Sequence, residues 1–146
     1  MDHVQTQILD RLTTLFSVLP TTGNRTYQAS EHPLTLSSMP GLTYTIAGEG
    51  NGGGGLTETI KLPKLKIVIY IKGDDLEVSN QVLAEIEGVL YGDFSGGRYL
   101  DGLVTNLIYG GSSRDYITAT ALKHTRVDVE YKLEYQTKDG YADESI

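Results

Sequence analysis

The sequence lacks cysteine and tryptophan, and it contains only two phenylalanines and four prolines among 146 residues. Because there is no cysteine, a disulfide framework, a thiolate nucleophile and a cysteine zinc site are all excluded. No segment approaches the ~20 consecutive apolar residues of a membrane-spanning helix, so no membrane span is predicted. The N-terminal M-D-H-V-Q-T-Q lacks the basic start and apolar core of a signal peptide. These absences predict a soluble protein made in the cytoplasm.

Basic side chains are also scarce. The chain has 19 Asp and Glu against 12 Lys and Arg, which gives a net charge of −7. An acidic surface repels phosphate, so tight binding of nucleic acid is not expected. The same repulsion would suit a channel through which DNA slides without being held.

Two segments show the spacing of amphipathic helices, one from Val4 to Leu19 and one from Leu76 to Tyr91. Pro20 is expected to end the first helix. For the second, Asp74 with Glu77 three residues later has the spacing of a capping box, and Gly92 fits a C-terminal glycine. The chain is long enough for one domain, residues 1–146, with a substantial core.

Several segments are rich in β-formers and predict strands between and after these helices. Runs of neighbouring strands favour a mostly antiparallel twisted sheet with both helices packed on one face, which is an α+β fold. Between Leu100 and Tyr109 we expect a short helical turn and then a strand, with a turn or bulge at Gly110–Ser113. The other predicted strands are Arg25–Ala29, Leu42–Ala47, Leu56–Leu62, Leu65–Lys72 after an interruption at Pro63, Tyr116–Leu122 and Thr125–Thr137.

The last of these strands alternates between apolar and charged residues. Side chains alternate faces along a strand, so the pattern predicts one buried and one open, charged face. The open face would meet solvent, a partner, or the lumen of an assembly. The buried set is Val127, Val129, Tyr131, Leu133 and Tyr135, and the charged set is Arg126, Asp128, Glu130, Lys132 and Glu134.

A glycine-rich segment precedes the central strand. A phosphate-binding loop would end in G-K-[ST] and lead into a helix, whereas L-T-E follows here and continues as strand. We therefore predict a flexible hairpin tip that becomes ordered against a partner. Residues 93–97 and the polar tail 138–146 are expected to be flexible in the same way. The candidate docking loop comprises Gly48, Glu49, Gly50, Asn51, Gly52, Gly53, Gly54 and Gly55.

Motifs for catalysis or metal binding are missing from the sequence. The histidines His3, His32 and His124 lack the i, i+4 spacing of a helical metal pair and are expected on the surface. There is no G-x-S-x-G nucleophile motif. The carboxylates of the last strand alternate regularly with Arg and Lys, whereas a catalytic pair needs a pocket that shifts its pKa. We predict no catalytic residue, no metal and no cofactor, and hence no enzyme.

The order and lengths of these segments resemble those of a known family. An N-terminal helix with Q-I-L-D-R-L-T-T-L-F leads into R-T-Y-Q-A-S-E-H-P and a strand ending near A-G-E. The strand K-L-K-I-V-I-Y-I-K-G-D-D, a second helix and the alternating R-V-D-V-E-Y-K-L-E-Y follow. From about Val4 to Thr137 the chain resembles the tail terminator proteins of long-tailed bacteriophages, the minor tail protein U family.

The resemblance implies a structural virion protein of the tail or neck, made in the host cytoplasm. It would form a ring, as a hexamer, that caps the tail tube, stops its polymerisation and presents a docking surface to the head–tail connector or a head-completion protein. Six copies would carry six times the charge of −7, so DNA would pass through the lumen without specific binding. The charged strand face would line that lumen or form subunit contacts, for example between Arg126 and Glu130.

Two other readings compete with this one. A head-completion or neck adaptor protein of the same machine would share a small α/β fold and ring assembly. A small-ligand-binding or enzymatic α+β domain would instead use the open sheet face, and it would need a concave pocket with convergent polar groups. The regular alternation of opposite charges on the last strand argues against that second reading.

Overall fold

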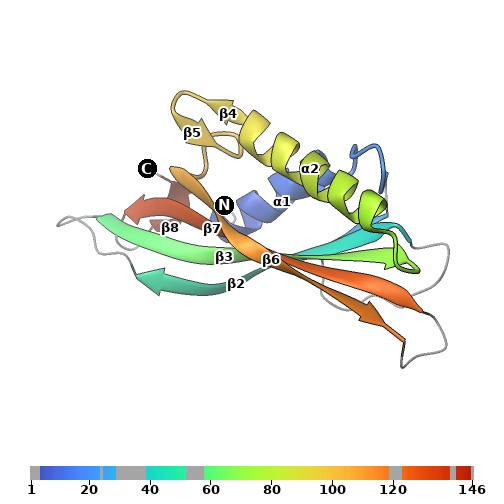
Figure 1. Cartoon of the computed structure of the whole chain (residues 1–146). Coiled ribbons are helices and arrows are strands. Elements are labelled where there is room, and N and C mark those ends of the chain that lie inside the picture. Colours follow the sequence, from blue (N-terminus) through green and yellow to red (C-terminus); the bar gives the residue numbers. More distant parts are fainter. Residues whose placement is uncertain are drawn as a thin grey trace.

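The computed structural model describes residues 4–23, 25–28, 39–51, 58–118, 123–138 and 141–145. Two helices cover one face of the main sheet, and no described helix lies on the opposite face, which we call the open face (Figure 1). No helix in the described ranges is long and apolar enough to cross a bilayer. The elements in chain order are α1 (Val4–Phe16), β1 (Thr26–Tyr27), β2 (Gly41–Asn51), β3 (Glu58–Lys72), α2 (Leu76–Gly92), β4 (Phe94–Ser95), β5 (Arg98–Tyr99), β6 (Asn106–Ile117), β7 (His124–Lys138) and β8 (Tyr141–Ser145).

The main sheet has the strand order β1-β2-β3-β7-β6, and β8 also pairs with β7. Every described pair in it is antiparallel except β1 with β2. The central pair, β3 with β7, stays in register from Glu58 opposite Lys138 to Lys72 opposite His124. This architecture confirms the predicted α+β class with a mostly antiparallel sheet and both helices on one face.

Helix α1 packs on the sheet through the predicted stripe. Val4, Ile8, Leu12 and Phe16 are fully buried and recur at four-residue spacing, so they lie on one side of the helix. The Phe16 ring meets the Tyr44 ring of β2 edge to face, with 5.1 Å between centroids. The helix ends at Phe16, a few residues ahead of Pro20.

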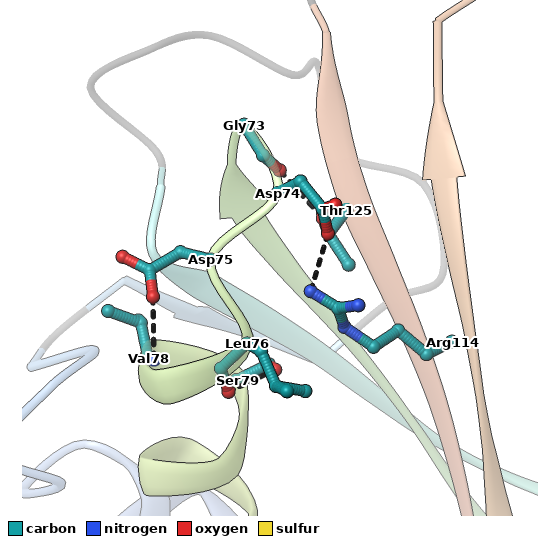
Figure 2. A network of polar contacts seen from close by, with 8 residues as sticks. All are labelled: Gly73, Asp74, Asp75, Leu76, Val78, Ser79, Arg114 and Thr125. Carbon is teal, nitrogen blue, oxygen red and sulfur yellow. Dashed lines mark hydrogen bonds and ion pairs between the residues drawn. The ribbon is translucent and has the colours of Figure 1, made fainter.

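Helix α2 begins at Leu76 as predicted, but the residue that caps it is one position later than predicted. The N-cap is Asp75, whose carboxylate accepts a hydrogen bond from the Val78 backbone N at 3.1 Å. Asp74, predicted as the cap, instead accepts a hydrogen bond from Arg114 of β6 at 2.6 Å (Figure 2). Gly92 was predicted to be the glycine that follows the last turn of the helix. It is instead the last helical residue, and Asp93 is the C-cap with φ −85°.

The predicted break at Pro63 is wrong as well, since β3 runs through it. Proline has no N–H to donate, and β2 accommodates it with a bulge between Ala47 and Gly50. Beyond the bulge, Gly50 and Asn51 pair with β3, so residues 48–51 belong to β2 and not to a flexible loop. The rest of the predicted docking loop, Gly52 to Gly55, lies outside the described residues.

Strand β6 joins two strands that the sequence suggested were separate. Gly110 is an extra residue between Tyr109 and Gly111, so the predicted bulge is confirmed and the strand continues past it to Ile117. A Cβ on Gly110 would lie 3.1 Å from the Glu130 backbone O, which explains a glycine there. The predicted helical turn at Leu100 is wrong, because Leu100 and Asp101 have positive φ angles of 54° and 57°.

Two segments predicted to be flexible form strands. Residues 93–97 lead into the β4–β5 hairpin, whose turn glycines, Gly96 and Gly97, have the positive φ that a two-residue hairpin turn favours. In the predicted tail 138–146, Lys138 belongs to β7 and Tyr141–Ser145 form β8, which pairs back onto β7. The polar composition of residues 138–146 predicted a flexible tail, but β8 is held by backbone hydrogen bonds to β7, which do not depend on apolar side chains.

An ion pair fastens α1 to the end of α2. Arg11 donates to both carboxylate oxygens of Asp93, with both distances 2.8 Å. These hydrogen bonds hold the pKa of Asp93 below its usual value. Because the pKa of Asp93 is lower in the folded than in the unfolded protein, its ionised form stabilises the fold at pH values above the unfolded pKa. This contribution to the free energy of unfolding is lost as the pH falls through the folded pKa.

Replacing Arg11 by alanine is therefore expected to lower the free energy of unfolding by about 1–2 kcal/mol at neutral pH. The difference from wild type should shrink below pH 4, because Asp93 is then increasingly protonated in both proteins. Urea unfolding at pH 7 and pH 2.5 checks this, with Arg98→Ala as the matched control. A deficit that is the same at both pH values would show that Arg11 acts through packing alone.

Candidate functional site: the open face of the sheet

The two faces of β7 are as the alternation predicted. Its apolar side chains are buried under the helices, with every member at most 3% exposed. The charged set, Arg126, Asp128, Glu130, Lys132 and Glu134, lies on the open face and is partly or fully exposed. Cross-strand partners share a face, so the register adds side chains of β2, β3 and β6 to the same surface. These are Thr45, Lys64, Lys66, Val68, Tyr70, Ile108, Ser113 and Asp115, with Thr43 on the same face but buried.

Several of these charges are paired within the chain. Arg126 Nη2 lies 3.0 Å from Asp128 Oδ1, and this contact raises the pKa of Arg126 above its usual value. Lys64 Nζ lies 3.9 Å from Glu130 Oε1 across β3 and β7. The sequence suggested Arg126 and Glu130 as partners across a subunit boundary, but each has a partner in its own chain.

The open face is balanced in charge. From the Asp115–Arg126 pair to the Asn106–Glu134 pair, it carries the basic residues Lys64, Lys66, Arg126 and Lys132 and the acidic residues Asp115, Asp128, Glu130 and Glu134. Helix α2, on the other side of the sheet, contains three Glu and no Lys or Arg. Helix α2 is therefore acidic, whereas the mixed charges of the open face suit contact with another protein better than repulsion of DNA.

A broad hollow of about 620 Å³ lies over the middle of this face. Its floor is the sheet itself, and its polar lining consists mainly of hydroxyls and the paired charges described above. Ser112 and Ser113 of β6 and Thr43 and Thr45 of β2 line opposite sides of it. Such an open, wide surface fits a protein segment rather than a small molecule, for which sites are enclosed and largely apolar.

A second hollow of about 360 Å³ lies at the end of the face near the start of β6. Leu62 and Ile108 line it and are 41% and 50% exposed, which is high for large apolar side chains. Lys64 and Lys132, which are direct cross-strand partners, also line it, together with Asn106 and Glu134. We call Leu62, Lys64, Ile108 and Lys132 the lysine hollow.

The described part of the chain contains no cluster of potential metal ligands, since no three His, Asp or Glu side chains there come together. His124, expected on the surface, is instead only 3% exposed, and its ring lies 6.1 Å from that of Tyr70. The other two histidines lie outside the described residues.

The lysine hollow could not be found from the sequence. Leu62, Ile108 and Lys132 are far apart along the chain, and only the register of β3, β7 and β6 brings them together. The one available signal was the charge alternation of β7, which gave Lys132 but not its apolar neighbours. Leu62 was also obscured by Pro63, which made the strand seem to end there.

Comparisons with known proteins give a fold but no sequence relative. No protein-family model and no curated protein matches the chain. Among solved structures 33 chains match. One comes from a structure titled "Virion of native gene transfer agent (GTA) particle", with a TM-score of 0.57 and 12% sequence identity, covering 92% of this chain and 96% of that one. At this identity the likeness shows that the two chains share a fold over nearly their whole lengths.

Proposed function

We propose that this protein is a structural component of a phage-like virion that caps the tail tube as a hexameric ring. The observation that carries the proposal is the fold shared, over 92% of the chain, with a chain of a virion particle. The independent resemblance of its sequence to tail terminator proteins points to the tail. In this role the ring stops polymerisation of the tube and offers a docking surface to the head–tail connector.

The open sheet face supports a role in assembly. It is broad, carries balanced charges and lacks any described cluster of metal ligands, and within the described elements both helices lie on the other side. A surface with both signs of charge can complement another protein surface and fix its register. The work of such a protein is binding and positioning, so we propose no catalytic step.

Polymerisation of the tail-tube protein tests the proposal directly. Purified protein is added to the assembling tube protein of the same virus, and tube lengths are measured by electron microscopy. Short tubes carrying a ring at one end are expected, and tubes without added protein should keep growing. Tubes of unchanged length that carry no ring would refute the capping role.

A second measurement separates capping from the neck-adaptor alternative. The protein is mixed with purified connector in one experiment and with tubes in another, and complexes are separated by size. Binding to tubes, with or without connector, is expected of a terminator. Binding to connector with no binding to tubes would assign the protein to head completion instead.

A further inference from the structure

We propose that copies of this chain join head to tail, by insertion of Leu76 of one copy into the lysine hollow of the next. This inference rests on the proposed function, which gives the ring its purpose. It adds the two surfaces through which neighbouring copies in the ring would bind each other. Each surface lies on the described part of the chain, and the two differ from one another. Contacts between two different patches generate rings when the rotation closes.

The lysine hollow has the features of a receptor for an apolar side chain flanked by carboxylates. Leu62 and Ile108 provide an exposed apolar lining. Lys64 and Lys132 face each other across β3 and β7, an arrangement of like charges that disfavours pairing of strands. Glu134 lines the same hollow, so its lining carries two basic residues and one acidic residue. Among the described residues Lys132 has no ion-pair partner within 4 Å, and Lys64 has only Glu130 at 3.9 Å. An incoming carboxylate would relieve this repulsion.

The first turn of α2 has the complementary features. Leu76 is 56% exposed, and the exposed residues Asp75 and Glu77 stand on either side of it in the sequence. We call these three residues the acidic knob. A hydrophobic side chain between two carboxylates matches, in hydropathy and in sign of charge, an apolar hollow whose two lysines outnumber its one glutamate.

The acidic knob is held in place before any partner binds. Asp75 caps the helix through Val78, and the neighbouring Asp74 is bound by Arg114 of β6 (Figure 2). Thr125 of β7 donates to the Gly73 carbonyl at 2.6 Å and ties the preceding turn to the sheet. A preorganised segment loses little conformational entropy on binding, which favours a stable contact.

The two surfaces lie at opposite ends of β3. Leu62 is near the start of the strand, and Lys72, its last residue, is close to the knob. Ten residues of extended chain separate them, which is about 33 Å at the usual rise per residue. The knob of a copy therefore cannot reach its own hollow, and the contact must be made with another copy.

Disulfide trapping tests the contact, because the chain has no cysteine of its own. The variant carrying Leu76→Cys and Ile108→Cys is expected to give a ladder of covalent multimers under mild oxidation. A pair with Leu76→Cys and Val18→Cys is the control, since Val18 is exposed but lies outside both surfaces. A ladder no stronger than that of the control would overturn the proposal.

Single-cysteine variants test the head-to-tail arrangement. Mixing Leu76→Cys protein with Ile108→Cys protein should give covalent dimers and nothing larger. Leu76→Cys alone and Ile108→Cys alone should give few dimers. If either single variant cross-links with itself as well as the mixture does, the interface is two-fold symmetric and the proposal fails.

Charge reversal provides a test without cross-linking. Glu77→Lys and Lys132→Glu should each weaken self-association about tenfold or more, measured by sedimentation over a concentration series. An equimolar mixture should recover association, since one interface is then wild type and the other has both charges reversed. Glu87→Lys and Lys66→Glu make the same charge changes elsewhere and should have little effect. The contact would be refuted if the wild-type protein stayed monomeric at all concentrations and the variant with Leu76→Cys and Ile108→Cys gave no covalent ladder.

These experiments test the contact between copies separately from the proposed capping function. Self-association is measured without tail tubes, so a trapped ladder would establish the contact even if tubes were not capped. Conversely, if Glu77→Lys and Lys132→Glu proteins capped tubes as the wild type does, the capping role would stand and this contact would be wrong.

Discussion

Replacing Phe16 by alanine is expected to lower the free energy of unfolding by about 3–5 kcal/mol, the usual range for an aromatic core residue. Phe16 is completely buried at the end of α1, and its ring packs edge to face on Tyr44 of β2. The loss would combine the transfer free energy of the ring with the cavity left behind, since Tyr44 is also packed and can move little. A small domain has only about 5–15 kcal/mol of stability in total.

Urea unfolding followed by circular dichroism measures this loss. Val18→Ala is the matched control, because Val18 lies two residues further along and is 73% exposed. Its effect should stay within about 0.5 kcal/mol. Tyr44→Phe offers a second comparison, since it removes the 2.5 Å contact with Thr13 Oγ1 but keeps the ring. A loss below about 1 kcal/mol in Phe16→Ala would mean that α1 does not pack on the sheet as described.

The strongest sequence patterns were those in which burial repeats at a fixed period. The stripe from Val4 to Phe16 and the alternation of β7 both placed the right side chains in the core. In each case the hydrophobic effect acts on many residues in the same sense, so the pattern survives local irregularities. The class of fold followed from these elements and their order.

Local rules failed where a tertiary contact competed with them. Asp74 has the spacing of a cap, but Arg114 of β6 binds it and the cap passes to Asp75. Pro63 usually ends a strand, but β2 bulges opposite it and pairing resumes on either side. Arg114 is distant in the sequence from Asp74, and the bulge of β2 is distant from Pro63. No local sequence pattern could therefore predict the cap at Asp75 or the continuous strand β3.

The candidate site was predictable only in part, and for a related reason. Alternation identifies which side chains of one strand share a face, and it gave the five charges of β7. The neighbours of those charges depend on register, and a single inserted residue such as Gly110 exchanges the faces of all that follow it. The meeting of Ile108 with Lys132 and Lys64 therefore required the structure.

The other large effect is expected on tube capping, from replacing Ile108 by aspartate. This change puts a carboxylate into the apolar part of the lysine hollow, where it would repel Asp75 and Glu77 of the incoming copy and pair with the lysines meant for them. Full burial of one large aliphatic side chain is worth about 1.5–3 kcal/mol. The binding free energy lost at one contact is lost again at every other contact of the ring. Capping by the variant should therefore be abolished at protein concentrations at which the wild type caps tubes.

Tube lengths by electron microscopy decide the matter, together with urea unfolding to show that the variant is folded. Because Ile108 is half exposed in the single chain, its replacement should change stability by less than about 1 kcal/mol. Tyr116→Asp is the control, since Tyr116 lies on the same strand, is similarly exposed at 45% and is outside the hollow. We expect uncapped tubes with Ile108→Asp and capped tubes with Tyr116→Asp. Equal capping by both variants would mean that the ring closes through a surface other than the lysine hollow.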